Sequence, residues 1–182
     1  MKKYQIIYID PPWSYRNKKT GGSMKSGSVT KYPTMSIEEI KALPIHNIAS
    51  KNSALFLWAT TPLLPEAFEV MKHWGYQYKT MLYWRKIMSL GMGFYFRGQV
   101  EQILVGIKGK VKAFRIQKAN IIQTKSLRHS QKPEEFRKLI ELIDLKPRIE
   151  LFAREKTEGW DAIGNDINGK DIKEELEAMI NE

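Results

Sequence analysis

Short apolar runs rich in β-branched and aromatic residues alternate with segments of helical periodicity along this chain, which narrows the folds it can adopt. The runs that predict strands are 4–9, 53–59, 76–84, 99–107 and 148–153. The segments that predict helices are 36–44, 62–75, the stretch after residue 133, and 170–182. This order predicts an α/β fold with a mixed, mostly parallel sheet and helices on both faces. Since neither a repeat nor a linker interrupts it, we expect a single domain over 1–182.

Two boundaries carry clear local signals. The first predicted strand ends at Asp10, because the following prolines lack the N–H that a ladder needs. The first helix has Ser36 as its N-cap, and Glu39 three residues later completes a capping box. Asp10 should therefore lie at the carboxyl end of a strand, where open α/β sheets place their ligand crevices.

Composition excludes several classes of protein and favours one kind of partner. The chain has no Cys and three His, so we expect neither a disulfide nor a metal site. No apolar run is long enough to span a bilayer and no signal peptide precedes the first strand, so we expect a complete cytoplasmic protein without membrane contact. The net charge of +10 favours polyanions such as nucleic acid, although many basic proteins bind none.

A long segment rich in Gly, Ser, Lys and Thr follows the first strand. It covers residues 14–31 and has no apolar periodicity, so we expect a flexible basic loop. Loops of this length are usually lids or binding segments, with a tolerated surface insertion as the alternative.

The tetrapeptide Asp10-Pro11-Pro12-Trp13 is the strongest candidate for chemistry. The prolines remove backbone freedom, so the Asp10 carboxylate and the Pro11 carbonyl can converge as fixed acceptors on one planar amino group. Trp13 offers an aromatic face for a base. Accepting both N–H bonds of an adenine amine would turn its nitrogen lone pair toward an electrophilic methyl group. The alternative is a rigid turn in which Asp10 caps a neighbouring helix.

Motifs along nearly the whole chain occur in an order that resembles the MT-A70 family of adenine N6-methyltransferases. After the tetrapeptide they are Tyr32-Pro-Thr-Met-Ser36, Leu55-Phe-Leu-Trp58, Trp74-Gly-Tyr76, Trp84-Arg-Lys86, Gly106-Ile-Lys-Gly109, His129-Ser-Gln-Lys-Pro-Glu134, Glu150-Leu-Phe-Ala-Arg154 and Trp160 through Gly164-Asn165. The resemblance implies a Rossmann-like methyltransferase fold in permuted order, with the catalytic segment ahead of the cofactor-binding strand. It also implies S-adenosylmethionine as the methyl donor.

The resemblance assigns site residues by position. It implies Asp10, Pro11, Pro12 and Trp13 as the catalytic segment, with Trp13 against the flipped base. The cofactor residues that it implies are Asp10, Lys132, Glu150, Phe152, Arg154, Lys156, Thr157, Asn165 and Asp166, among which Glu150 would accept the ribose hydroxyls. The substrate residues that we expect are Trp13, Tyr15, Tyr32, Arg97, Arg128 and His129.

Simpler interpretations of these residues remain open. Glu150, an acid in an apolar strand, needs a partner, and a salt bridge with Arg148 or Arg154 would serve as well as a ribose. A lysine at a helix start suggests a nearby anion, but Lys132 could also be solvated. Asn165 could simply form a turn in a loop. Trp58 and Trp84 suit a core, and solvated charge is the ordinary state of Arg97, Arg115, Arg128 and His129.

The sequence therefore predicts methyl transfer from S-adenosylmethionine to adenine N6 in DNA, without a metal, with RNA as the alternative polymer. Ala153, Lys156 and Asp166 depart from the family pattern, so a non-catalytic nucleic-acid-binding or partner subunit with a degenerate cofactor pocket is a second hypothesis. A methyltransferase for a protein amide or a small-molecule amine is a third. We also expect a homodimer, in which the segment 88–96 forms either the interface or an internal loop.

Overall fold

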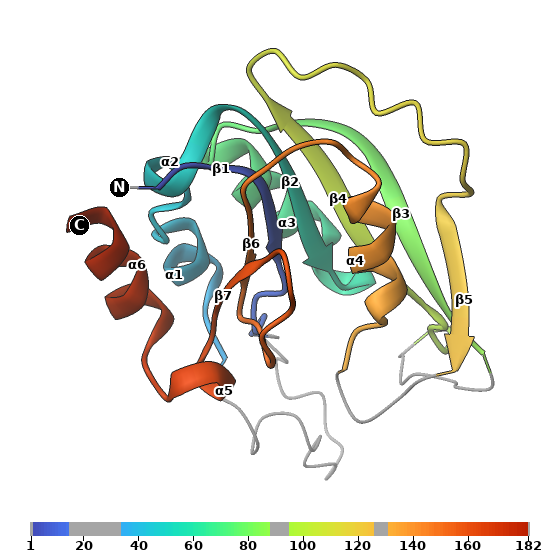
Figure 1. Cartoon of the computed structure of the whole chain (residues 1–182). Helices are drawn as coiled ribbons and strands as arrows, with labels where there is room; N and C mark the ends of the chain where they lie inside the picture. Colours follow the sequence, from blue (N-terminus) through green and yellow to red (C-terminus); the bar gives the residue numbers. More distant parts are fainter. Residues whose placement is uncertain (1, 15–33, 88–94, 126–130, 182) are drawn as a thin grey trace, which may run out of the picture.

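The computed structural model describes residues 2–14, 34–87, 95–125 and 131–181, which form an α/β fold (Figure 1). The strands are β1 (Tyr4–Ile9), β2 (Ala49–Ala59), β3 (Gln77–Ile87), β4 (Val100–Lys108), β5 (Ile121–Lys125), β6 (Arg148–Leu151) and β7 (Asp161–Ile163). The α-helices are α1 (Ile37–Lys41), α2 (Ile45–Ile48), α3 (Leu64–His73), α4 (Glu134–Glu141), α5 (Asn165–Asn168) and α6 (Ile172–Asn181), and a 3-10 turn over Thr61–Leu63 leads into α3.

The strands form one sheet in the order β5-β3-β4-β2-β1-β6-β7. Only β4 runs antiparallel to its two neighbours; every other adjacent pair is parallel. The predicted mixed, mostly parallel sheet is thereby confirmed. Because β4 is reversed, its first residues lie on the side of the sheet at which the other six described strands end.

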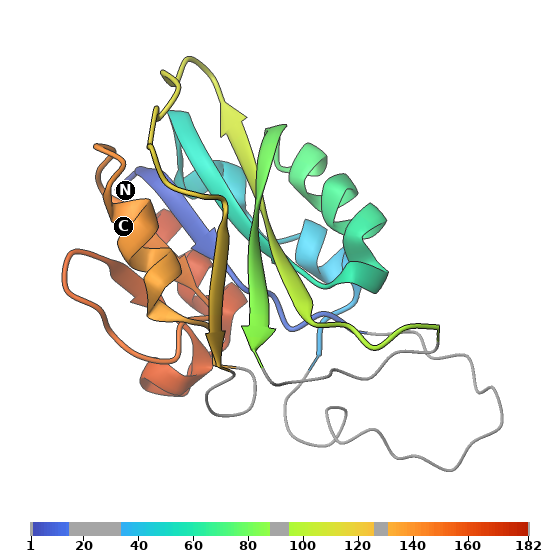
Figure 2. The same cartoon turned by 90° about the vertical axis from the view of Figure 1, so that its right-hand side faces the viewer.

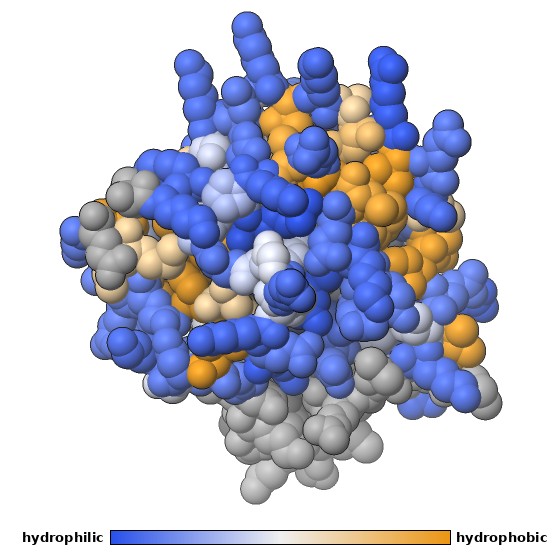
Figure 3. Space-filling model, in the orientation of Figure 1, coloured by the Kyte–Doolittle hydropathy of each residue, from blue (hydrophilic) through white to orange (hydrophobic). Residues whose placement is uncertain are grey.

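Helices cover both faces of the sheet, as predicted. Side chains alternate along β1: Ile7 and Ile9 belong to one buried cluster, and Ile6 and Tyr8 belong to the other. The first cluster includes buried side chains of α1, α2, α3 and α6, whereas α4 covers the second. Figure 2 shows the sheet between α3 and α4. The face seen in Figure 3 is mostly hydrophilic, with apolar surface gathered at its upper right.

The predicted start of α1 is confirmed, whereas its end and the start of β2 differ from the prediction. The Ser36 side chain accepts from the Glu39 backbone N–H, and the Glu39 carboxylate accepts from the Ser36 N–H at 2.8 Å, so the capping box is confirmed. The helix ends at Lys41, before the predicted stop at Pro44, which serves instead as the N-cap of the short α2. β2 begins at Ala49, four residues before the predicted strand, because the chain pairs with Tyr4 of β1 there.

The sequence interpretation missed the two edge strands. β5 lies between the predicted strands 99–107 and 148–153, where no strand was predicted, and its side chains alternate between half-buried and exposed positions. β7 has three residues, too few for a periodic signal. Of the predicted basic loop, residues 15–31 lie outside the described part of the structure. Among the helices that are described, none has the length and apolar character needed to cross a membrane.

Two glycines with positive φ test how closely the chain is packed. Gly109 has φ +69°, and a Cβ there would lie 2.2 Å from the Lys51 carbonyl oxygen; Gly75 has φ +81° and open space. We expect Gly75→Ala to cost about 1 kcal/mol, from backbone strain alone. Gly109→Ala should cost roughly 3 kcal/mol or more, because backbone must also move. Urea unfolding measures both; equal losses would contradict the close approach.

Candidate active site

The Asp10-Pro11-Pro12-Trp13 segment forms a tight turn at the carboxyl end of β1. The Trp13 backbone N–H donates to the Pro11 carbonyl at 2.9 Å, and the Met35 N–H donates to the Pro12 carbonyl at 2.8 Å. The Ser14 N–H returns a bond to the Met35 carbonyl at 3.0 Å. A carbonyl oxygen has two lone pairs, so Pro11 retains acceptor capacity beyond its bond to Trp13.

The Trp13 side chain anchors this turn to the sheet. Its indole is 6% exposed, belongs to the apolar cluster on one face, and donates from Nε1 to the Trp58 carbonyl of β2 at 3.0 Å. A buried indole whose N–H is satisfied holds the turn in one position. Its role as a platform for a base stays a prediction.

Lys132, just before α4, joins two carboxylates from different strands. Its Nζ lies 3.0 Å from Asp10 Oδ2 and 3.2 Å from Glu101 Oε2, and 4.8 Å from the centre of the Trp58 ring. Because Lys132 lies at the start of a helix, an anion was expected near it, and that anion is a pair of carboxylates, those of Asp10 and Glu101. The alternative of a solvated lysine is wrong, because the Lys132 side chain is only 19% exposed.

Burial and charge set opposing tendencies in this cluster. Burial raises the pKa of the Asp10 carboxyl above its ordinary value, although the Lys132 ammonium opposes the rise. Burial alone would lower the pKa of Lys132, but Asp10 and Glu101 outweigh it and raise that pKa. Burial would likewise raise the pKa of Glu101, yet Lys132 and Lys86 outweigh it and lower that pKa. Lys132 therefore stays charged while Asp10 is the carboxyl more easily protonated.

A cavity of about 230 Å³ opens beside the cluster. It is lined by Tyr8, Asp10, Trp58, Gln131, Lys132, Pro133, Arg137, Glu150, Phe152, Arg154 and Glu155. Five residues named from the sequence as cofactor contacts are brought together there: Asp10, Lys132, Glu150, Phe152 and Arg154. They come from the ends of β1 and β6 and from the approach to α4.

Glu150 does have a salt-bridge partner, Arg137, which the sequence did not suggest, and the suggested pairing with Arg148 is wrong. Arg137 of α4 binds Glu150 Oε2 through Nη1 at 3.0 Å and Glu155 Oε1 through Nη2 at 2.8 Å. Arg148 instead donates from Nη2 to the Glu141 and Ile143 carbonyls at the end of α4. Burial raises the pKa of Glu150, and Arg137 opposes the rise.

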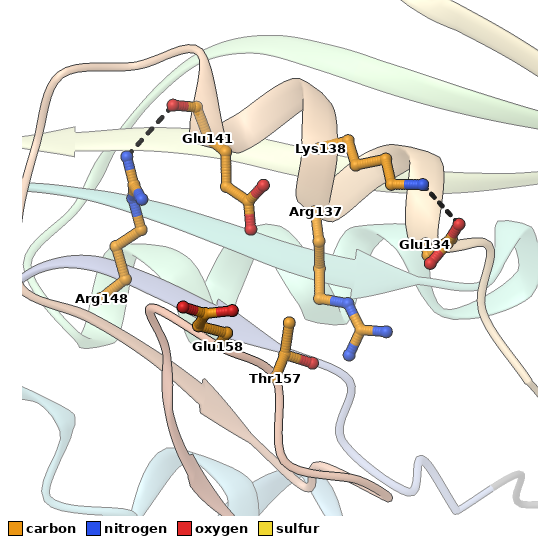
Figure 4. A pocket seen from close by; sticks show the side chains of 7 residues that line it. All are labelled: Glu134, Arg137, Lys138, Glu141, Arg148, Thr157 and Glu158. Atoms are coloured by element: carbon orange, nitrogen blue, oxygen red, sulfur yellow. Dashed lines mark hydrogen bonds and ion pairs between the residues drawn. The ribbon is translucent and has the colours of Figure 1, made fainter.

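Arg137 also lines a second cavity, of about 370 Å³ (Figure 4). Arg137 extends from α4 toward Thr157, which was expected at the cofactor and instead lines this second cavity. Lys156 is exposed and lines neither cavity. The two described cavities thus share Arg137 as a common wall.

The remaining predicted residues lie elsewhere. Asn165 and Asp166 are exposed in the first turn of α5, so the loop suggested for Asn165 is wrong. Arg97 is exposed between β3 and β4, beside Tyr95 and Phe96 at 96% and 90% exposure. Tyr15, Tyr32, Arg128 and His129 lie outside the described residues.

Ala153, one of the departures from the family pattern, is compensated locally. Its N–H donates to the Ile163 carbonyl at 2.9 Å, which ties the exits of β6 and β7 together. A Cβ on Gly164 would lie 2.2 Å from the Ala153 carbonyl oxygen. The backbone of Ala153 therefore lies so close to Gly164 that position 164 has no room for a side chain.

Several residues of the site escaped the sequence interpretation. Glu101 carried a usable signal, because it is an acid in an apolar strand, the same signal that singled out Glu150. Trp58 was assigned to the core and is 1% exposed, yet it also lines the cavity. Arg137 gave no such signal, since a cation on a helix surface is ordinary.

Removing the Lys132 charge should destabilise the protein in a pH-dependent way. Because its pKa is lowered, Glu101 stabilises the fold above its ordinary pKa of about 4.3, and this contribution is lost as the pH falls through the folded value. Lys132→Met leaves two buried carboxylates without this cation, so we expect a loss of about 3 kcal/mol near neutral pH. The difference from wild type should narrow only as the pH falls below that ordinary value, through the lowered pKa of Glu101. Urea unfolding near neutral pH and near roughly pH 3 tests this, and an equal loss at both would contradict it.

Comparison with known proteins places this site in a family. The family model described as MT-A70 matches residues 4–166 of this chain. Type II methyltransferase M.MunI from Mycoplasma sp is 31% identical over 100% of this chain and 85% of its own length. A putative N(6)-adenosine-methyltransferase MT-A70-like protein of Medicago truncatula is 28% identical over 95% of the chain. Human N(6)-adenine-specific methyltransferase METTL4 is 26% identical over 91% of it.

The relatives differ in how much of their own length is covered. The chain spans 28% of the Medicago protein and 38% of human METTL4, so those proteins carry much sequence outside the matched region. The match over residues 4–166 and the likeness to M.MunI along the whole chain nevertheless agree on the same assignment: the chain belongs to the MT-A70 family of adenine methyltransferases.

Proposed function

We propose that this protein transfers a methyl group from S-adenosylmethionine to the N6 amine of adenine in DNA. The observation that carries the proposal is the Asp10 carboxylate, which lies at the carboxyl end of β1 inside a cavity and is held by Lys132 at 3.0 Å. A fixed, ionised acceptor beside a proline carbonyl suits a planar amine with two N–H donors. Membership of the MT-A70 family supports adenine as the base.

DNA is the polymer we favour. The relative that matches this chain in length, M.MunI, is a Type II methyltransferase, whereas the plant relatives named for adenosine extend far beyond the match. The net charge of +10 favours a polyanion of either kind. RNA remains the alternative.

The order of strands supports the permuted arrangement that the family resemblance implied. β1 carries Asp10 and comes first in the chain, whereas β6, which carries Glu150, comes sixth. The two strands are parallel neighbours, with Tyr8 opposite Glu150. A catalytic strand that precedes its cofactor-binding neighbour in sequence therefore ends beside it at one edge.

The residues around the cavity fit S-adenosylmethionine by their chemistry. Glu150 is an acceptor for ribose hydroxyls, and Lys132 and Arg154 are cations suited to an amino-acid carboxylate. When bound, this cofactor supplies the electrophilic methyl group. Glu150 already pairs with Arg137, so the ribose would add to an existing hydrogen-bonded carboxylate rather than satisfy an isolated one.

In the proposed mechanism the protein positions the amine and balances its charge. Asp10 and the Pro11 carbonyl each accept one N–H, which directs the nitrogen lone pair at the methyl carbon. As the new N–C bond forms and the S–C bond breaks, positive charge develops on the amine. The Asp10 carboxylate stabilises that charge, and a proton then leaves the amine toward Asp10. In duplex DNA the base must first leave its stack, at a cost of a few kcal/mol.

The other hypotheses are less well supported. A non-catalytic binding subunit would have no use for an Asp10 carboxylate held in a cavity. Lys156 and Asp166, two of the departures that suggested this hypothesis, do not line that cavity. A protein amide or a small amine fits the same acceptors, but gives the excess of cations no role.

We further expect a cytoplasmic, single-domain protein that forms a homodimer, and gel filtration with light scattering tests the last point.

Replacing Asp10 should abolish methyl transfer while the protein stays folded. Asp10→Asn keeps the shape and removes the charge, so we expect a loss of at least about 1,000-fold in rate. The assay follows labelled methyl groups from S-adenosylmethionine into unmethylated duplex DNA, single-stranded DNA and RNA, with nucleoside mass analysis. Asp144→Asn, at an exposed aspartate after α4, is the matched control. Retained activity in Asp10→Asn would overturn the catalytic assignment.

Arg97 should contribute to binding of the polymer. It is exposed next to the aromatic side chains of Tyr95 and Phe96, a combination that suits phosphate and base contacts. Arg97→Ala should lower the slope of log binding constant against log salt by about one, measured with a fluorescent duplex. Lys72→Ala on α3, at the opposite edge of the sheet, is the control. A slope unchanged in Arg97→Ala would remove this residue from the interface.

A further inference from the structure

Glu101, the second residue of β4, has both carboxylate oxygens engaged by lysines. Lys86 of β3 contacts Oε1 and Lys132 contacts Oε2 at 3.2 Å. Since Lys132 also binds Asp10, four charges of alternating sign form one chain from Lys86 through Glu101 and Lys132 to Asp10. Their side chains are between 19% and 29% exposed.

Two tryptophans form the floor under this chain of charges. Lys86 Nζ lies 4.7 Å from the Trp84 ring centre, and Lys132 Nζ lies 4.8 Å from that of Trp58. The two rings meet edge to face with centres 6.2 Å apart. Their Nε1 atoms donate to the Thr124 and Tyr8 hydroxyls, respectively, which fixes both indoles. The lysines are therefore confined to one path above a rigid surface.

Stabilisation of the fold does not by itself account for this chain of four charges. Buried ion pairs repay much of the cost of desolvating the charges but seldom stabilise more than apolar side chains would. Lys86 and Glu101 line neither described cavity, so neither touches a ligand placed there. Glu101 contacts Lys132, the ion-pair partner of Asp10, and Lys86 acts on Lys132 through Glu101.

We propose that Lys86 and Glu101 are positioning residues, which set how Lys132 is shared between Glu101 and Asp10 and thereby how strongly Asp10 accepts hydrogen bonds from the target amine. The proposal rests on the proposed function for its catalytic meaning, but the charge chain itself is a property of the protein alone. If the Lys132 ammonium were drawn fully to Asp10, it would compete with the target amine for the Asp10 carboxylate. If it were drawn fully to Glu101, Asp10 would be easily protonated.

The charged and titratable groups that face Asp10 come from several elements. They are Lys132, Glu101, Arg154, Glu150 and Tyr8. Among these, Glu101 is the group whose charge Lys86 directly balances. Changing Lys86 or Glu101 therefore alters Asp10 without removing any group that lines the cavity.

The test uses two variants that should move Asp10 in opposite directions. Glu101→Gln removes a negative neighbour and releases Lys132 to Asp10, so the pKa of the Asp10 carboxyl should fall. Lys86→Met removes a positive charge and draws Lys132 toward Glu101, so the same pKa should rise. Carboxyl carbon NMR titration of the ligand-free protein measures both, with Asp10→Asn identifying the resonance.

Lys41→Met is the matched control. Lys41 also pairs with two glutamates, Glu38 and Glu69, and its side chain is 19% exposed, but it lies on α1. We expect the Asp10 titration to stay unchanged in this variant. In Lys86→Arg, which keeps the positive charge, the pKa of the Asp10 carboxyl should stay close to that of the wild type. If Glu101→Gln fails to fold, as thermal unfolding would show, the Lys86 variants alone decide the sign.

Opposite shifts in the two variants would establish the proposal, and the acid limb of the kcat profile should move in the same directions. Shifts of the same sign, or none in either variant, would overturn it even if the wild type methylates DNA. Opposite shifts in a protein that shows no methyl transfer would instead leave the charge chain standing and refute the proposed function. The two failures are thus distinguishable.

Discussion

One half-buried ammonium group, that of Lys132, links the strands at the end of the sheet where the 230 Å³ cavity opens. It lies between carboxylates from β1 and β4 and rests on the indole of a residue from β2. Without it, Asp10 and Glu101 would be two buried acids beside one another, an arrangement that strongly favours protonation. The position of α4, which begins two residues after Lys132, is therefore tied to the ionisation state of Asp10.

Strand direction explains why these groups can meet. In a wholly parallel sheet, the start of a strand lies at the edge opposite to the site. The reversal of β4 brings Glu101 to the edge where β1 ends, and pairing with β3 places Lys86 nearby. Antiparallel pairing also lets β3 and β4 follow each other without a crossover helix. A single reversed strand thus supplies a polar residue that the parallel strands alone would not.

The sequence predicted the larger elements and about half of the site, for identifiable reasons. Amphipathic helices and buried strands have strong periodic signals, and the prolines after Asp10 mark a strand end without ambiguity. Edge strands such as β7 lack such a signal. Pair partners are set by three-dimensional packing, so the choice of Arg137 rather than Arg148 for Glu150 could not be read from spacing along one strand.

The contact between Ala153 and Gly164 makes the two strand exits one unit. The carbonyl of Ala153 occupies the volume that any side chain at 164 would need. Position 164 is consequently restricted to glycine, since alanine there would push β7 away from β6. Since Glu150 lies three residues before Ala153, a substitution at position 164 would also alter the wall of the 230 Å³ cavity that Glu150 lines.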